Sequence, residues 1–277
     1  MNHGQQAADP GQSAADGSSC LTANDWICPE YVRSRTPELL DATVEHVWIT
    51  ASSVTLALLI ALPLALVARR WRRATGPVLG LTTVLYTIPS LALYALLLPV
   101  FGVSASVVVT GLALYSLTVL VRNILTGLAS VPREAREAAR GMGYGPARLL
   151  FEVELPLALP ALMAGVRIAT VSAVSLTTVG AIVGFGGLGN LIHEGMESLF
   201  KAQVLTASVL CVLLAVLADL ALLGLQRRLT PWTRGTAPRR SRLRSRAAVP
   251  SGAASPSDQS DADTPARYAG SGVERRR

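Results

Sequence analysis

The sequence predicts an all-α polytopic membrane protein with about five transmembrane helices. Hydrophobic residues make up 51% of the chain and charged residues only 16%, and the mean hydropathy is +0.42. Soluble domains carry about 25% charged residues, so this composition is typical of a membrane protein. The net charge of +7 comes from arginines that flank apolar runs and fill the C-terminal segment. This distribution favours membrane insertion over nucleic-acid binding.

Five apolar runs give the expected spans and their direction. The first run, residues 46–68, is followed by four arginines, Arg69, Arg70, Arg72 and Arg73. Arginines concentrate on the cytoplasmic side, so the N-terminus is expected outside. The other spans are expected at residues 76–100, 107–121, 157–183 and 204–225. An uncharged link after the second span and two arginines after the last one agree with an N-out, C-in topology.

The two ends of the chain have the composition of non-membrane segments. Residues 1–45 are rich in small and polar residues and are expected to form a flexible extracytoplasmic leader, without the apolar core of a signal peptide. Cys20 and Cys28 lie in this leader and are candidates for a disulfide on the oxidising side of the membrane. Residues 229–277 are expected to form a disordered basic cytoplasmic tail, whose run Arg239–Arg246 suits an anionic lipid surface.

A polar segment, residues 133–156, interrupts the apolar runs between the third and fourth spans. Helix formers from Glu134 to Arg140 open it, and a glycine-rich turn follows. A second amphipathic piece, Ala147–Glu154, ends at Leu155-Pro156. The pattern predicts a helix–turn–helix that lies across the cytoplasmic face.

The spacing in this segment resembles the EAA loop of ABC importer permeases. The matching residues are Glu137, Ala138, Ala139, Gly143, Leu155 and Pro156. The family prefers Ile where this chain has Val153. The resemblance implies a type I ABC importer permease-like fold in which this cytoplasmic coupling loop docks on a separate ATPase subunit. Small alanines permit close approach, Glu137 offers a carboxylate to a basic or amide-lined pocket, and Gly143 frees the turn.

Further segments are similar to those of the osmoprotectant permeases. They are Tyr86–Leu93, Arg122-Asn123, Glu154–Pro160, Met163–Arg167 and Gly186–Gly189. The likeness covers residues 47–225. It implies import of glycine betaine, choline, carnitine or proline across a bacterial plasma membrane. It also implies three partners: an extracytoplasmic substrate-binding protein, a cytoplasmic ABC ATPase that binds ATP and Mg, and a second permease copy or paralogue. The chain itself is expected to hold no cofactor.

Polar and aromatic residues inside the spans are candidates for the translocation pathway. They are Tyr86, Thr87, Pro89, Ser90, Tyr115 and Arg167. Proline inside a span frees a carbonyl and bends the helix, which protein or water must then satisfy. Tyrosine rings can face a cationic solute, although ordinary packing is the alternative for them. Arg167 and Asp219 either line the route, pair across the bundle, or extend separately to the cytoplasmic interface.

Enzymatic function classes lack the residues that they need. The string Gly184-x-Gly186-x-x-Gly189 matches a dinucleotide fingerprint, but it follows a membrane helix and not a strand, which favours a structural turn. Lys201 has no glycine turn before it, so a P-loop is excluded. No Cys/His spacing indicates a metal site. The remaining alternatives are a permease for methionine or another polar amino acid, and an ion-coupled secondary transporter, for which Asp219 is the single candidate carboxylate.

Overall fold

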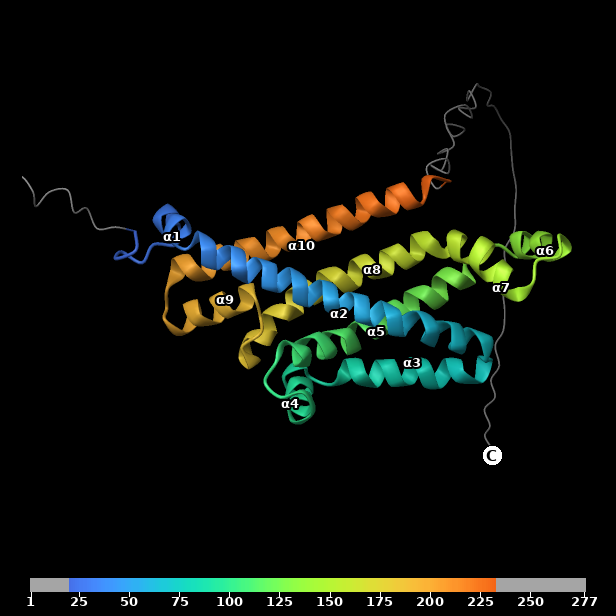
Figure 1. Ribbon diagram of the computed structural model, residues 1–277, viewed down its shortest axis with the longest axis horizontal. Coiled ribbons are helices and arrows are strands. Elements are labelled where there is room, and N and C mark those ends of the chain that lie inside the picture. The colour runs from blue at the N-terminus through green and yellow to red at the C-terminus, as the bar shows by residue number, and fades with distance from the viewer. Residues whose placement is uncertain (1–19, 233–277) are drawn as a thin grey trace, which may run out of the picture. The chain divides into compact units, whose positions relative to one another are not determined.

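The computed structural model describes residues 20–232, and the regular secondary structure in that part of the chain is helical. Three long helices are apolar enough to cross a membrane: α2 (Thr36–Arg70), α5 (Ala105–Ala129) and α10 (Lys201–Leu229). A fourth apolar run, Pro146–Val183, is built around α8 (Leu155–Thr177). Counting one bent helix pair as a single span brings the number of candidate spans to five. The expected all-α architecture with about five spans is confirmed (Figure 1).

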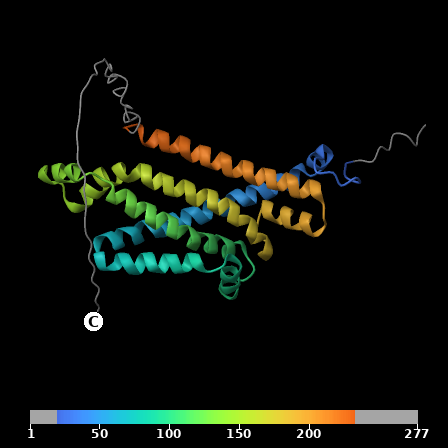
Figure 2. The ribbon, with the colours of Figure 1, turned by 180° about the vertical axis from the view of Figure 1, so that it is seen from behind.

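Helix α5 is the centre of the bundle and packs between α2 and α8 (Figures 1 and 2). Its buried Leu117, Val121 and Leu128 belong to one apolar cluster with alanines of α2. These alanines recur every fourth residue, at Ala57, Ala61 and Ala65, and so share one face of α2. Small residues let helix backbones approach closely where lipid gives no hydrophobic drive for association. The α2–α5 contact therefore depends on the close packing of complementary helix surfaces.

The contact between α5 and α8 depends on glycine. A Cβ added at Gly165 would lie 2.5 Å from the Cβ of Asn123, and one added at Gly127 would lie 3.0 Å from the Cβ of Ala161. Both distances are shorter than normal carbon–carbon contacts. The two helices therefore cross at a separation that larger residues at these positions would increase.

The span expected over residues 76–100 is broken and is not one helix. It consists of α3 (Arg72–Thr87) and α4 (Ser90–Phe101), which are bent by 99° at Ile88-Pro89. Figures 1 and 2 both show α4 turned across the direction of α3. Proline lacks an N–H and restricts the residue before it, so the helix ends there. The expected bend is present, and its angle of 99° divides the apolar run into two separate helices.

Side chains of α5 satisfy the carbonyl groups around this break. The hydroxyl of Tyr115 donates to the carbonyl of Ile88, and the hydroxyl of Thr118 donates to the carbonyl of Thr82. Broken helices persist at membrane depth where neighbouring protein supplies such donors. The break is thus a fixed part of the fold.

The glycine-rich run before α9 (Leu188–Glu197) is a tightly packed turn. A Cβ at Gly186 would lie 2.5 Å from the backbone nitrogen of Ala181, and one at Gly189 would lie 2.4 Å from the Cα of Thr178. The side chain of Asn190 accepts a hydrogen bond from the N–H of Gly186 at 3.0 Å. Close backbone approach explains these glycines, in agreement with the structural reading of the dinucleotide-like string.

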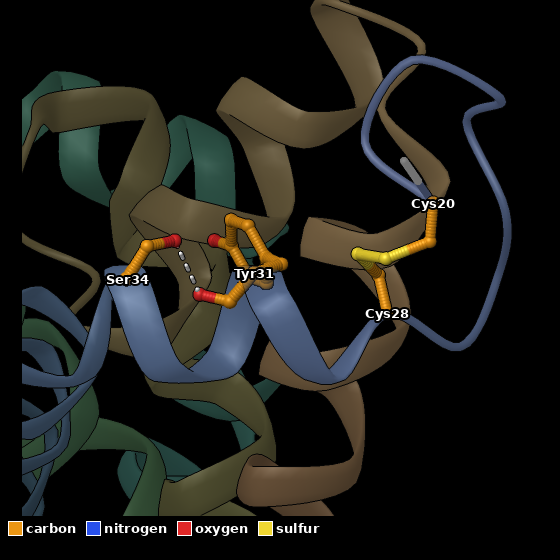
Figure 3. The surroundings of a disulfide bond; sticks show 4 residues. All are labelled: Cys20, Cys28, Tyr31 and Ser34. Atoms are coloured by element: carbon orange, nitrogen blue, oxygen red, sulfur yellow. Dashed lines mark hydrogen bonds between the residues drawn. A yellow bond between two sulfur atoms is a disulfide. The ribbon is translucent and has the colours of Figure 1, made fainter. Parts of the chain in front are cut away.

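From Cys20 onward the leader is folded, which differs from the expected flexible segment. Cys20 and Cys28 form a disulfide directly before α1 (Pro29–Ser34) (Figure 3). The side chain of Asn24, in the loop between them, donates to the carbonyl of Leu199 and accepts from the N–H of Lys201, both at 2.9 Å. The loop thereby binds the turn between α9 and α10. Residues 1–19 of the expected leader and 233–277 of the expected tail lie outside the described part of the chain.

The cap formed by residues 20–34 has an apolar core of its own. The ring of Tyr31 packs edge-on against Phe200 with a centroid distance of 5.2 Å. Burial raises the pKa of the Tyr31 hydroxyl above its ordinary value. The hydroxyl of Ser34 donates to the carbonyl of Tyr31, as Figure 3 shows. Sequence composition averaged over residues 1–45 conceals this small packed unit.

An ion pair joins α8 to α10. The guanidinium of Arg167 makes two hydrogen bonds, both of 2.7 Å, to the two carboxylate oxygens of Asp219. The pair shows that these two residues meet across the bundle, which is one of the alternatives that the sequence leaves open. Helix α10 otherwise shows apolar side chains on its exposed face, including Val209, Val212 and Val216.

Removing the disulfide should loosen the cap. The cysteines are separated by 8 residues in sequence, and closing a loop of that size contributes about 2–3 kcal/mol in the chain-entropy model. We expect Cys20→Ser/Cys28→Ser to increase hydrogen exchange in α1 and in the α9–α10 turn, and to leave α6 (Arg133–Gly141) unchanged. Cys211→Ser, which alters the free cysteine of α10, is the matched control. Equal exchange in both variants would show that Asn24 and Tyr31 alone hold the cap.

Removing one charge of the α8–α10 ion pair should lower the stability of the protein more than removing both charges. Asp219→Asn leaves the Arg167 guanidinium without its counter-charge, whereas Arg167→Leu/Asp219→Leu removes both charges. We expect the single variant to show the lower thermal midpoint in detergent. Glu197→Gln, in an exposed i, i+4 pair with His193, serves as the control. A double variant less stable than Asp219→Asn would contradict this account.

Candidate functional site

The EAA-like segment begins with α6, which presents a small polar surface to solvent. Glu137 and Ala138 are exposed on this helix, whereas Ala139 is buried, with 2% of its surface accessible. The structure therefore separates the three residues. Glu137 and Ala138 are available to a partner, and Ala139 packs inside the chain.

The end of α6 is closed by a glycine in the left-handed region. Gly143 has φ +81°. Its N–H donates to the carbonyl of Arg140 at 2.9 Å, and the N–H of Tyr144 donates to the carbonyl of Ala139 at 3.1 Å. This pair of bonds is the Schellman arrangement that terminates helices. A Cβ at Gly143 would meet no other atom within 4 Å, so space does not require a glycine there. The positive φ of the backbone does.

The second half of the segment leads directly into a spanning helix. A single turn, α7 (Pro146–Leu149), is followed by a π-helical turn, Leu150–Glu154, and then by α8. Proline has no N–H, and its ring clashes with the carbonyl four residues before it, which for Pro156 is that of Glu152. We attribute the wide π turn to this clash. Leu155 and Pro156 are half-buried at the start of α8, and so belong to the bundle more than to the exposed surface.

Glu154 is a site residue that the sequence interpretation missed. Its side chain is only 5% exposed, and its Oε1 lies 2.6 Å from Nη2 of Arg69 and 3.1 Å from Nε of Arg136. Arg136 also donates to the carbonyl of Leu128 at 2.6 Å. The available signal was an acidic residue between Val153 and Leu155, in a chain with four arginines after its first span.

A cavity of about 700 Å³ lies between the end of α2 and the α6–α7 connection. Its lining combines charged and aromatic side chains with apolar ones: Arg69, Arg70, Arg140, Tyr144, Glu154, Leu66, Leu149 and Leu150. The guanidinium of Arg148 stacks on the ring of Tyr144 at 4.3 Å and binds Glu152 at 2.9 Å. The segment 133–156 is therefore a folded unit with a concave side.

The pathway candidates gather at the α3–α4 break, with one exception. Tyr86 is 53% exposed, and its ring meets that of the mostly buried Tyr115 edge-on at 5.8 Å. Thr87 and Pro89 are exposed beside it, and Ser90 is half-buried. The exception is Arg167, whose guanidinium is taken up by Asp219.

Two other features of the described residues bear on the chemistry. Tyr94 is 1% exposed and packs in the core with Leu112 and Val108, so it faces no solute. Within residues 20–232, no group of three His, Cys, Asp or Glu side chains is arranged to hold a metal ion.

Comparison with known proteins agrees with this geometry. Residues 51–235 match the family described as binding-protein-dependent transport system inner membrane component. The chain is 34% identical to the choline transport system permease protein OpuBB of Bacillus subtilis, over 73% of this chain and 93% of that protein. It is 37% identical to the osmoprotectant import permease protein OsmW of Salmonella typhimurium, over 73% and 96%.

One further relative and one solved structure are also similar to this chain. The glycine betaine/carnitine/choline transport system permease protein OpuCD of Bacillus subtilis is 38% identical over 70% of this chain and 85% of its own length. The methionine ABC transporter MetNI, in an inward-facing conformation, has a similar fold, with a TM-score of 0.65 and 24% identity over 71% of this chain and 98% of the other. This chain therefore belongs to the binding-protein-dependent transport system inner membrane component family and is a membrane permease subunit of an ABC importer.

Proposed function

We propose that this permease imports a quaternary ammonium osmoprotectant, such as glycine betaine, choline or carnitine, or the related solute proline. The observation that carries the proposal is the set of relatives at 31–38% identity, whose names specify choline, carnitine, glycine betaine or osmoprotectants. An extracytoplasmic substrate-binding protein would deliver the solute. The exposed aromatic corner at the α3–α4 break supports the same class, because aromatic faces attract cations that have no N–H to donate.

The corner formed by Tyr86 and Tyr115 is our candidate for a section of the pathway. The two rings meet edge-on, and exposed Thr87 and Pro89 lie at the break, close to Tyr86 in sequence. Discontinuous helices in transporters place polar backbone where solute passes. Arg167 has no part in this proposal, since its charge is neutralised by Asp219.

We propose further that exposed Glu137 and Ala138 dock on a cytoplasmic ABC ATPase, which binds ATP and Mg and supplies the chemistry. Two ATPase copies and a second permease copy or paralogue would complete the importer. Closure of the ATPase pair would move α6 and shift the spans between inward-open and outward-open states. In this role Gly143 sets where α6 ends, and Leu155 and Pro156 connect the segment to α8.

Two alternatives have specific but weaker support. A permease for methionine or another polar amino acid fits the solved structures with similar folds, but those are only 18–24% identical and show fold alone. An ion-coupled secondary transporter needs a free intramembrane carboxylate. Its candidate, Asp219, is held by Arg167.

The cargo is tested by uptake. Cells that lack this permease should lose uptake of radiolabelled glycine betaine, choline or carnitine at high osmolarity, and the unaltered gene should restore it. Tyr86→Ala should lower that uptake more than Tyr86→Phe, since only phenylalanine keeps the aromatic face. Normal uptake of all these solutes and of proline, with loss of methionine or another amino acid, would favour the first alternative.

The docking role is tested at Gly143. A left-handed conformation costs an L-residue about 1–2 kcal/mol, and asparagine tolerates it better than alanine or valine. We therefore expect co-purification of the ATPase, at matched membrane expression, to fall in the order Gly143→Asn, Gly143→Ala, Gly143→Val.

Substitutions on the exposed surface of α6 test the docking role by the same co-purification measurement. Glu137→Ala should weaken the complex by about 2–5 kcal/mol where its partner charge is buried at the contact. Ala138→Trp adds bulk at the surface that is proposed to approach the ATPase. Full transport by the triple variant Glu137→Ala/Ala138→Trp/Gly143→Val would refute the docking role of this segment.

A further inference from the structure

One buried carboxylate connects the proposed docking helix to three other helices. Glu154 closes the π turn that precedes α8, and its Oε1 contacts Arg69 in the last turn of α2 and Arg136 in α6. Arg136 reaches α5 as well, by donating to the carbonyl of Leu128. The segments that meet here are far apart in sequence, since Glu154 lies 85 positions after Arg69.

Helix α6 has little else to hold it. Among the described residues, Arg136 is the one α6 side chain with an ion pair or hydrogen bond to the rest of the chain. Its exposed charged residues, Glu134, Glu137 and Arg140, make no such contact. Ala139 is buried but adds only a methyl group. A displacement of α6 therefore acts on the bundle mainly through Arg136 and the backbone.

The chemistry of this cluster suits transmission of movement. Arg69 donates a 2.6 Å hydrogen bond to Glu154, and such bonds between guanidinium and carboxylate are stronger than those between neutral groups. Nε of Arg136 lies 3.1 Å from the same oxygen as an ion pair, without the geometry of a hydrogen bond. Burial at 5% exposure removes the water that would otherwise replace a lost partner. The π turn adds a wide, irregular segment at the point where the coupling segment becomes a spanning helix, and such turns are frequent at functional sites.

We propose that Glu154 is the positioning residue that transmits displacement of α6 to α2 and α8. The residues Glu154, Arg69 and Arg136 are called the Glu154 clamp below. The inference rests on the coupling function proposed above and adds the route by which α6 acts on the spans. Glu154 touches neither solute nor nucleotide in this account, and works through the two arginines.

The test uses the complete importer in proteoliposomes and measures solute transported per ATP hydrolysed. Glu154→Gln keeps the shape of the side chain and removes its charge. We expect this variant to retain the ATPase and hydrolyse ATP, while the transport ratio falls at least about tenfold, within the range of known coupling between sites. Glu152→Gln is the matched control, since Glu152 lies on the same π turn, is half-exposed, and pairs within the described residues with Arg148 alone. Its ratio should match that of the unaltered chain.

A second variant keeps the test valid should Glu154→Gln fail to fold. Arg136→Lys retains the positive charge but cannot contact the Glu154 carboxylate and the Leu128 carbonyl through one planar fork. It should lower the transport ratio while α6 still retains the ATPase.

The outcomes separate the clamp from a merely structural role. Transport and hydrolysis that fall in parallel, with an unchanged ratio, would overturn the clamp and leave Glu154 a structural residue. An unchanged ratio in Arg136→Lys together with Glu154→Gln would overturn it too, while the docking function stands. If the unaltered chain retains no ATPase, the proposed function fails, and the clamp fails with it.

Discussion

Polar groups that enter an apolar bundle must find partners inside the protein, and three features of this chain depend on that constraint. At the α3–α4 break, the hydroxyl of Tyr115 donates to the carbonyl of Ile88, and one turn and a half earlier in α3 the hydroxyl of Thr118 donates to the carbonyl of Thr82. Between α8 and α10, Arg167 and Asp219 neutralise each other. Beside α6, the buried carboxylate of Glu154 holds two arginines. Each pairing fixes a helix that hydrophobic packing alone leaves free to slide, because lipid solvates apolar side chains as well as a neighbouring helix does.

Features that depend on residues close together in sequence could be predicted, whereas features that depend on contacts between distant residues could not. Spans were predictable because a run of apolar residues must match the bilayer thickness wherever its neighbours lie. The end of α6 was predictable as well, since a glycine that stops a helix acts through its own backbone and Gly143 has the expected positive φ. The size of the bend at Pro89 was not predictable, because it depends on donors of α5, 27 residues further along the chain in the case of Tyr115.

Two parts of the structure escaped prediction for the same physical reason. The folded cap of residues 20–34 depends on Asn24 and Tyr31 meeting the α9–α10 turn, and Leu199 in that turn lies 175 positions after Asn24. Local composition is dominated there by small and polar residues and predicts flexibility. Glu154 entered the sequence interpretation only as part of the family-like segment Glu154–Pro160, and no role was predicted for it. Its importance comes from Arg69, and no local pattern of residues 133–156 contains that arginine.

The two ends of the bundle are held by different kinds of bond, and this difference has a mechanical meaning. The end that carries α1 and α9 is closed by a disulfide and by hydrogen bonds from Asn24 to backbone groups. Backbone groups cannot change partner without unfolding a turn. The end that carries α6 is held by side-chain ion pairs around Glu154. Under the proposed docking role, a displacement of α6 would reach α2 and α8 through these ion pairs, while the backbone bonds of the cap would hold the opposite ends of α2 and α10 in place.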